Sequence, residues 1–157
     1  MKLSIGTAQF GLNYGITNKN GKIKNNEIEK ILFLANQSGI NSFDTAQDYG
    51  DSEKLIGQYT QDRELNITTK LSNLGIESFS ESNIDIWDYK LKLSLQHLKR
   101  DKIGTLLIHN PSDLQKPGNI FLKDWLKGIK YSNLVEKIGL SIYDQHDLIN
   151  VEKEILD

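Results

Sequence analysis

The 157-residue chain contains no cysteine, only two prolines and no long apolar run. Without cysteine, it can form neither a disulfide framework nor a thiolate metal site. No stretch approaches the ~20 consecutive apolar residues that a membrane-spanning helix needs, and no signal-peptide pattern precedes Leu3. We therefore expect a cytoplasmic protein.

The chain also lacks an excess of charge of one sign. Its 19 lysines and arginines against 21 aspartates and glutamates give a net charge of -2, with no block of like charge. Binding to nucleic acid or to a membrane surface therefore has no electrostatic support. The composition, with 38% hydrophobic and 25% charged residues, is typical of one globular domain with its own core.

Short apolar runs alternate with amphipathic segments along the whole chain, which is the pattern of βα units. The predicted strands are Lys2–Ile5, Asn41–Phe43, Ile67–Thr69, Thr105–Ile108 and Val135–Ser141. The predicted helices are Glu27–Ser38, Ser52–Tyr59, Ile84–Lys99, Ile120–Tyr131 and a fifth helix after Asp144, with Leu148, Val151 and Ile155 on its apolar side.

Apolar residues at helical spacing indicate which faces of these helices are buried. In the first helix, Asn26 and Glu29 suggest a capping box and Gly39 a C-terminal stop. The buried stripes are expected to be Ile28, Ile31, Leu32 and Ala35, then Trp87, Leu91, Leu95 and Leu98, and then Phe121, Trp125 and Ile129.

Five βα units of roughly 30 residues predict an α/β fold, an incomplete (β/α)8 TIM-type barrel whose parallel, curved sheet follows chain order. A closed barrel takes ~250 residues, so residues 1–157 would form its N-terminal portion. Three strands would be missing, and we expect the chain to self-associate as a homo-oligomer through its exposed sheet edges. We also expect an uncovered apolar inner face built from Leu3, Ile5, Phe43, Leu106, Ile108 and Ile138.

Four residues with useful chemistry lie at or just beyond the ends of successive strands. Asp44 follows the second strand, Tyr49 lies in the next loop, Lys70 ends the third strand and His109 ends the fourth. In a parallel barrel the C-terminal strand ends converge on one face, and that face carries the chemistry.

The four residue types suit the reduction of a carbonyl by hydride transfer, which requires a proton for the carbonyl oxygen. A tyrosine can donate one, but its ordinary pKa near ~10 makes it reluctant at pH 7. A neighbouring ammonium favours the phenolate, and a carboxylate can hold that ammonium charged and oriented. A histidine can hydrogen-bond the substrate oxygen or share the proton.

The sequence around these residues resembles that of the aldo-keto reductases. The resemblance rests on residues 39–57, GINSFDTAQDYGDSEKLIG, and on residues 6–11, GTAQFG. Lys70 after ITT and His109 in LLIHNP match two further positions of the family. The resemblance covers the whole chain in order.

The resemblance implies that Tyr49 is the general acid/base, that Lys70 promotes its proton transfer, that Asp44 pairs with Lys70, and that His109 orients the carbonyl. It implies a small-molecule carbonyl substrate and NADPH as cofactor, with NADH as the alternative.

Further contacts follow from the same resemblance. Gly6, Thr7, Asp44 and Ser141 would contact the nicotinamide end of the cofactor, and Phe10 and Tyr14 would line the substrate side. Two departures are expected: Ile142 stands where the family usually has an asparagine, and the strands that grip the pyrophosphate and 2′-phosphate are missing.

Simpler explanations exist for each residue alone. Asp44 could be a cap, Lys70 a solvated charge, Tyr49 a packing residue and His109 a structural histidine. Their joint occurrence at strand ends favours a site. Asp48, Asp51 and Glu53 could suggest a cation site, but solvation and the charge preference of a helix start explain them better, so no metal is predicted.

Three classes of function remain open. The first is an NAD(P)H-dependent carbonyl oxidoreductase. The second is a regulatory or binding module that keeps the fold, and the third is a truncated, inactive half-barrel that self-associates.

Overall fold

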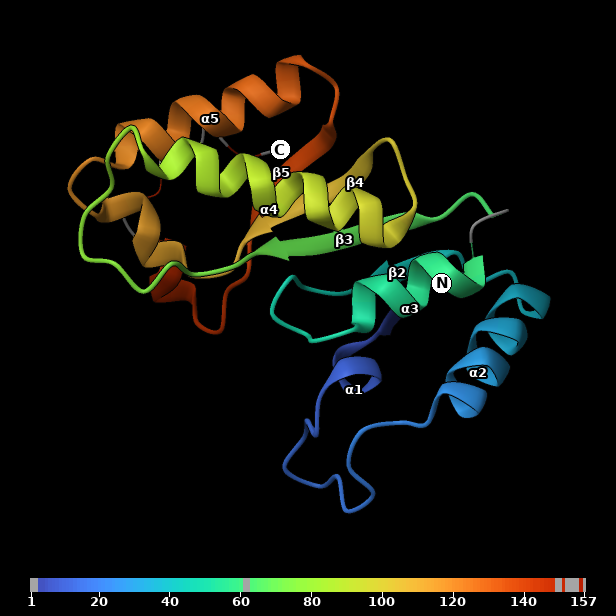
Figure 1. Ribbon diagram of the computed structural model, residues 1–157. Coiled ribbons are helices and arrows are strands. Elements are labelled where there is room, and N and C mark those ends of the chain that lie inside the picture. Colours follow the sequence, from blue (N-terminus) through green and yellow to red (C-terminus); the bar gives the residue numbers. More distant parts are fainter. Residues whose placement is uncertain (1–2, 61–62, 149–150, 152–155, 157) are drawn as a thin grey trace.

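A computed structural model of the chain describes residues 3–60, 63–148, 151 and 156, and its centre is a five-stranded parallel sheet in the order β1-β2-β3-β4-β5 (Figure 1). The strands are β1 (Ser4–Gly6), β2 (Ser42–Asp44), β3 (Asn66–Leu71), β4 (Ile103–Ile108) and β5 (Val135–Leu140). Every neighbouring pair is parallel. The predicted α/β class and strand order are confirmed.

The helices follow the strands as the alternation predicts. They are α1 (Ala8–Gly11), α2 (Asn25–Gln37), α3 (Ser52–Thr60), α4 (Asn83–Leu98) and α5 (Asn119–Tyr131), with 3-10 turns η1 (Pro111–Gln115) and η2 (Gln145–Leu148). Consecutive helices are also neighbours in space: α2 contacts α3, α3 contacts α4, and α4 contacts α5. The short α1 and η1 were not predicted.

The two ends of α2 test the predicted capping signals. The proposed capping box is wrong, because the helix already begins at Asn25 with Lys24 as its N-cap and no side chain caps it. The predicted stop at Gly39 is confirmed: its φ is 68°, and its N–H donates to Asn36 O at 3.0 Å. Ile40 N donates to Ala35 O at 2.8 Å, which completes a Schellman motif.

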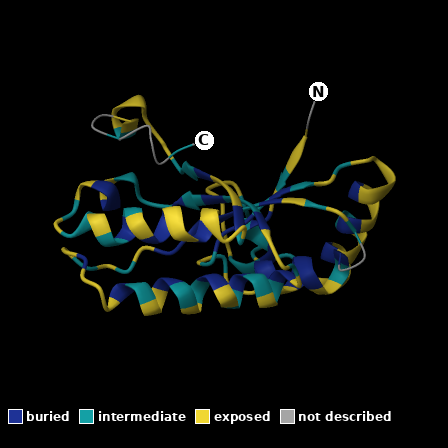
Figure 2. Cartoon of the chain, turned by 90° about the horizontal axis from the view of Figure 1, so that it is seen from above, coloured by how far each residue is buried: buried dark blue, intermediate teal, exposed yellow. Residues whose placement is uncertain are grey.

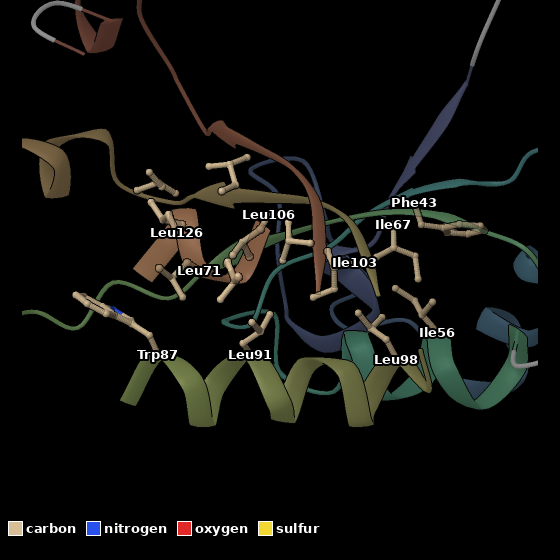
Figure 3. Close-up of a cluster of buried hydrophobic side chains, with 14 of the residues drawn as sticks. Phe43, Ile56, Ile67, Leu71, Trp87, Leu91, Leu98, Ile103, Leu106 and Leu126 are labelled. Carbon is tan, nitrogen blue, oxygen red and sulfur yellow. The ribbon is translucent and has the colours of Figure 1, made fainter. Parts of the chain in front are cut away.

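The hydrophobic core lies between the sheet and the helices. Trp87, Leu91 and Leu98 point from α4 toward the strands, where they meet residues such as Leu106 (Figure 3). In Figure 2 the helices are accordingly buried on one side and exposed on the other. Phe121 was predicted to be buried but is only partly buried. The inner side of α5 is instead occupied by Leu122, Trp125, Leu126 and Ile129.

The expected apolar inner face is wrong for most of its residues, although Leu3 is 53% exposed. Phe43, Leu106, Ile108 and Ile138 are at most 2% exposed and belong to the core under the helices. Successive residues of a strand point to opposite faces, so the other face carries the residues between them. Across the strands it presents Ser4, Ser42, Asn66, Thr68, Thr105 and Lys137, all exposed or half-buried. The face away from the helices is therefore largely polar.

The predicted fifth helix can be compared with the structure only at its start, because residues 149–150 and 152–155 lie outside the described residues. Asp144 does act as a cap, since its Oδ1 accepts a hydrogen bond from His146 N at 2.8 Å. The turn that follows is the short η2 rather than an α-helix, and Ile155 lies outside the described residues. No helix in the described part of the chain is long and apolar enough to cross a membrane.

Two adjacent leucines of β4 lie on opposite faces of the sheet, so their substitution by alanine should lower the free energy of unfolding by different amounts. Leu106 is fully buried under the helices, so Leu106→Ala should lower the free energy of unfolding by roughly 2–5 kcal/mol. Leu107 lies on the polar face against Lys70 and Gly139, so Leu107→Ala should cost clearly less. Urea denaturation of both variants checks this, and equal losses would contradict the assignment.

Candidate active site

Asp44 and Lys70 form an ion pair at the C-terminal edge of the sheet. Lys70 Nζ lies 2.6 Å from Asp44 Oδ1 and donates a second hydrogen bond to Thr45 O at 2.9 Å. Lys70 is buried, at 6% exposure, whereas the Asp44 side chain is 40% exposed. A buried ammonium needs such partners to remain charged. The contact predicted between Lys70 and Asp44 is therefore present.

Tyr49 and His109 lie against this pair. Lys70 Nζ is 5.0 Å from the centroid of the Tyr49 ring. The His109 ring, directly after β4, is 6.3 Å from the Tyr49 ring in an edge-on arrangement. The ends of β2, β3 and β4 and the loop after β2 thus bring all four predicted residues together.

The backbone around Tyr49 is fixed by its neighbours in the loop and by α1. Tyr49 N donates to Ala46 O at 3.1 Å, and Tyr49 O accepts from Ser52 N at 3.1 Å. A Cβ placed on Gly11 would lie 1.6 Å from Tyr49 O, so only glycine permits this approach. Gly11 was the signal in the sequence for the unpredicted contact between α1 and the Tyr49 loop.

Thr7 has a structural position beneath the site. It is fully buried, and its hydroxyl donates to Asp44 O at 2.8 Å while accepting from Ser52 Oγ at 2.8 Å. Ser52 Oγ in turn accepts from Thr45 Oγ1 at 3.0 Å. These hydroxyl groups join the end of β1, the end of β2 and the start of α3, so the buried Thr7 side chain holds the backbone of Asp44.

The remaining residues predicted to contact cofactor or substrate differ in accessibility. Gly6 ends β1 beside Asp44, and a Cβ there would meet no atom within 4 Å. Ser141 follows β5, is half-buried and donates from its N–H to Ile108 O at 3.0 Å. Phe10 is 2% exposed, so its predicted place beside the substrate is wrong. Tyr14 is 52% exposed, with its ring 6.4 Å from that of Tyr49.

The three acidic residues near Tyr49 have separate partners. Asp48 Oδ2 lies 3.7 Å from His109 Nδ1, and Asp51 Oδ2 lies 3.1 Å from Lys22 Nζ. Glu53 is buried and accepts a hydrogen bond from Thr69 Oγ1 at 2.6 Å. Among the residues that the structure describes, no group of three or more acidic or histidine side chains could hold a metal ion.

A hollow of about 990 Å³ lies at the opposite edge of the sheet, where the strands begin. Its lining includes Asn41, Asn66, Lys102, Gly104, Glu136 and Lys137. Asp44, Lys70 and His109 lie at the other ends of these strands. The hollow is therefore not part of the candidate site.

Glu53 is the buried titratable group next to the site. Burial raises the pKa of its carboxyl above the ordinary value of 4.5, while hydrogen bonds from Thr69 and Ser94 act in the lowering direction. Since the native state holds this proton more tightly than the unfolded chain, the Glu53 contribution to stability decreases as pH rises from about 4.5 through the raised pKa.

This linkage predicts how a Glu53→Gln variant depends on pH. The variant has no titrating group at this position, so parent stability relative to the variant should be greater at pH 5 than at pH 8. Urea denaturation of both proteins at the two pH values measures the difference between their free energies of unfolding. The contributions of the other titrating groups are common to both proteins and cancel in this difference. A difference that grows with rising pH would reverse the sign and contradict the burial of a carboxylate at this position.

Comparison with known proteins gives a consistent family. The model of the aldo/keto reductase family matches residues 2–156. D-arabinose 1-dehydrogenase of Saccharomyces cerevisiae is 26% identical over 124 residues, which cover 74% of this chain and 36% of that protein.

Solved structures show the same likeness. An aldo-keto reductase from Pseudomonas aeruginosa is 28% identical with a TM-score of 0.69, over 88% of this chain and 54% of that one. The Bombyx mori aldo-keto reductase in complex with NADP is 22% identical with a TM-score of 0.63, over 88% and 45%. The chain thus spans about half the length of these structures and about a third of the yeast protein.

Proposed function

The chain belongs to the aldo/keto reductase family, and we propose that Asp44, Tyr49, Lys70 and His109 catalyse the NADPH-dependent reduction of an aldehyde or ketone to an alcohol. The observation that carries the proposal is the buried Lys70 ammonium, 2.6 Å from the Asp44 carboxylate and 5.0 Å from the centroid of the Tyr49 ring.

The proposed roles follow from this geometry. Asp44 holds the ammonium in place, and the ammonium favours release of the proton from the Tyr49 hydroxyl to the carbonyl oxygen. The His109 imidazole, edge-on to the Tyr49 ring, hydrogen-bonds the same oxygen and orients the carbonyl. When bound, NADPH supplies the hydride that the carbonyl carbon accepts.

The nicotinamide end of the cofactor fits the strand ends next to this group. The open space over Gly6, the half-exposed Asp44 and the half-buried Ser141 could receive it. Thr7 would act indirectly by holding the Asp44 backbone. NADPH is our proposal over NADH, and the NADP-bound Bombyx mori relative supports that choice.

We further propose that residues 1–157 form the N-terminal part of a longer barrel domain, since the structural relatives are about twice as long. The alternative is an inactive or regulatory half-barrel that self-associates. Strands β1 and β5 support it, because among the residues that the structure describes each pairs with a strand on one side only. We also propose a cytoplasmic location.

Removing the Tyr49 hydroxyl tests the catalytic proposal. In the protein expressed from its full reading frame, Tyr49→Phe should lower kcat for an aldehyde by roughly 10²–10⁴-fold, because the phenol acts in the transition state. The Kd for NADPH, measured by fluorescence titration, should remain within about twofold, since the hydroxyl contributes little to holding the nucleotide. Tyr131→Phe, on an exposed residue of α5, is the matched control. Unchanged turnover in Tyr49→Phe would rule out its role.

The isolated 157-residue chain tests the alternative. With two open strand edges, it should self-associate in light scattering and bind NADPH more weakly than the protein from the full reading frame. A monomer at high concentration with equal NADPH affinity would contradict both expectations.

A further inference from the structure

Gln47 lies in the same loop as Tyr49, two residues earlier, and its side chain joins three parts of the molecule. Its Oε1 accepts hydrogen bonds from Ser72 N at 3.0 Å and Ser72 Oγ at 3.2 Å, just beyond β3. Its Nε2 donates to Ser94 Oγ on α4 at 3.1 Å. Because a backbone N–H can only donate, Oε1 must face Ser72, which fixes the orientation of the amide.

The hydrogen bonds continue from Ser94 into the core. Ser94 is 1% exposed, and its hydroxyl hydrogen-bonds the buried carboxyl of Glu53 on α3. Since Ser94 Oγ accepts from Gln47, its single proton is available for Glu53, which also accepts from Thr69 Oγ1 at 2.6 Å. The result is a directed chain from Gln47 through Ser94 to Glu53, with Thr69 at its end beside Lys70.

The backbone connects this chain to the candidate site. Gln47 N donates to Lys70 O at 3.2 Å, and Tyr49 N donates to Ala46 O at 3.1 Å. A shift of Gln47 would therefore move the turn that carries Tyr49 relative to the Lys70 ammonium. We propose that Gln47 is a positioning residue, which sets the distance between Tyr49 and Lys70 through its side-chain hydrogen bonds to Ser72 and Ser94. The catalytic consequence rests on the function proposed above for Tyr49.

The first test compares Gln47→Ala with Gln37→Ala in the protein from the full reading frame. Gln37 is an exposed residue at the end of α2, which makes it a matched control. Gln47→Ala should lower kcat roughly 10- to 100-fold, as expected for a misplaced proton donor, with the Kd for NADPH within about twofold. Gln37→Ala should change neither. A kcat for Gln47→Ala within about twofold of the parent would overturn the proposal.

Gln47→Glu gives a second test, the pH dependence of kcat, which general destabilisation of the protein would not change in the same way. The ionised side chain keeps an acceptor for Ser72 but has no donor for Ser94. It also adds a negative charge near the Glu53 carboxyl of α3. The other charged groups around Glu53 are Asp48 of the loop and His97 of α4. Protonation restores an O–H donor. The kcat ratio of Gln47→Glu to parent should therefore rise as pH falls from 8 to 5.5, whereas the ratio for Gln47→Ala should stay flat. A flat ratio for both variants would overturn the proposal, and the comparison within one variant holds even if Gln47→Ala folds poorly.

Amide hydrogen exchange of the 157-residue chain separates this proposal from the catalytic one. In Gln47→Ala the amides of Tyr49 and Ser52 should exchange faster than in the parent, while those of α2 should not, because only the loop has lost its attachment. Unchanged exchange at Tyr49 and Ser52 would overturn the positioning role. Turnover that survives in Tyr49→Phe, together with faster exchange in Gln47→Ala, would instead overturn the catalytic role and leave the positioning of the loop in place.

Discussion

The buried ammonium of Lys70 is the constraint on which the site depends. A charged group with 6% exposure requires compensation, and the Asp44 carboxylate and the Thr45 carbonyl provide it from the end of β2. Those two acceptors stay in place only if β2 and β3 keep their parallel register, with Asp44 opposite Thr68. The ion pair therefore couples the pairing of the sheet to the position of the ammonium beside the Tyr49 ring.

The two faces of the sheet have different chemistry because side chains alternate along each strand. Phe43 and Leu106 point into the helical layer, and their neighbours Asp44 and Leu107 belong to the other face. Packing of the helices thus fixes the strands through one set of residues and leaves the other set for polar groups. A shift by one residue in β2 would bury the Asp44 carboxylate and expose Phe43, so burial of the core also keeps the site residues on the right face.

The sequence was sufficient for features that depend on local order along the chain. Strand order, the stop of α2 at Gly39 and the convergence of Asp44, Lys70 and His109 all follow from apolar runs and from what stands at their ends. The face of β4 that packs against the helices could not be predicted, because residues 106–108 are all apolar and give no alternation. The capping box failed for a related reason, since the helix could begin two residues earlier at no visible cost in the sequence.

Contacts between distant segments were also beyond prediction. The approach of α1 to the Tyr49 loop depends on Gly11, and the attachment of Gln47 depends on Ser72 and Ser94, 25 and 47 residues away along the chain. Gly11 alone does not show which segment approaches it, and no local pattern links Gln47 to the two serines. The burial of Phe10 follows from the same unpredicted α1, which turns that side chain into the core.

The candidate residues are divided between the inner strands and the edge strands of the sheet. This division determines which of them a five-stranded sheet can fix in position. Asp44, Lys70 and His109 come from β2, β3 and the end of β4, and each of these strands has a partner on both sides. Gly6 ends β1 and Ser141 follows β5, and within the described part of the chain each of these strands pairs on one side only. Proton transfer needs groups fixed to within a fraction of an ångström, and the paired inner strands provide that without closure of the sheet. The nicotinamide contacts proposed for Gly6 and Ser141 instead lie at edge strands, so we expect whatever covers those edges to act first on cofactor binding.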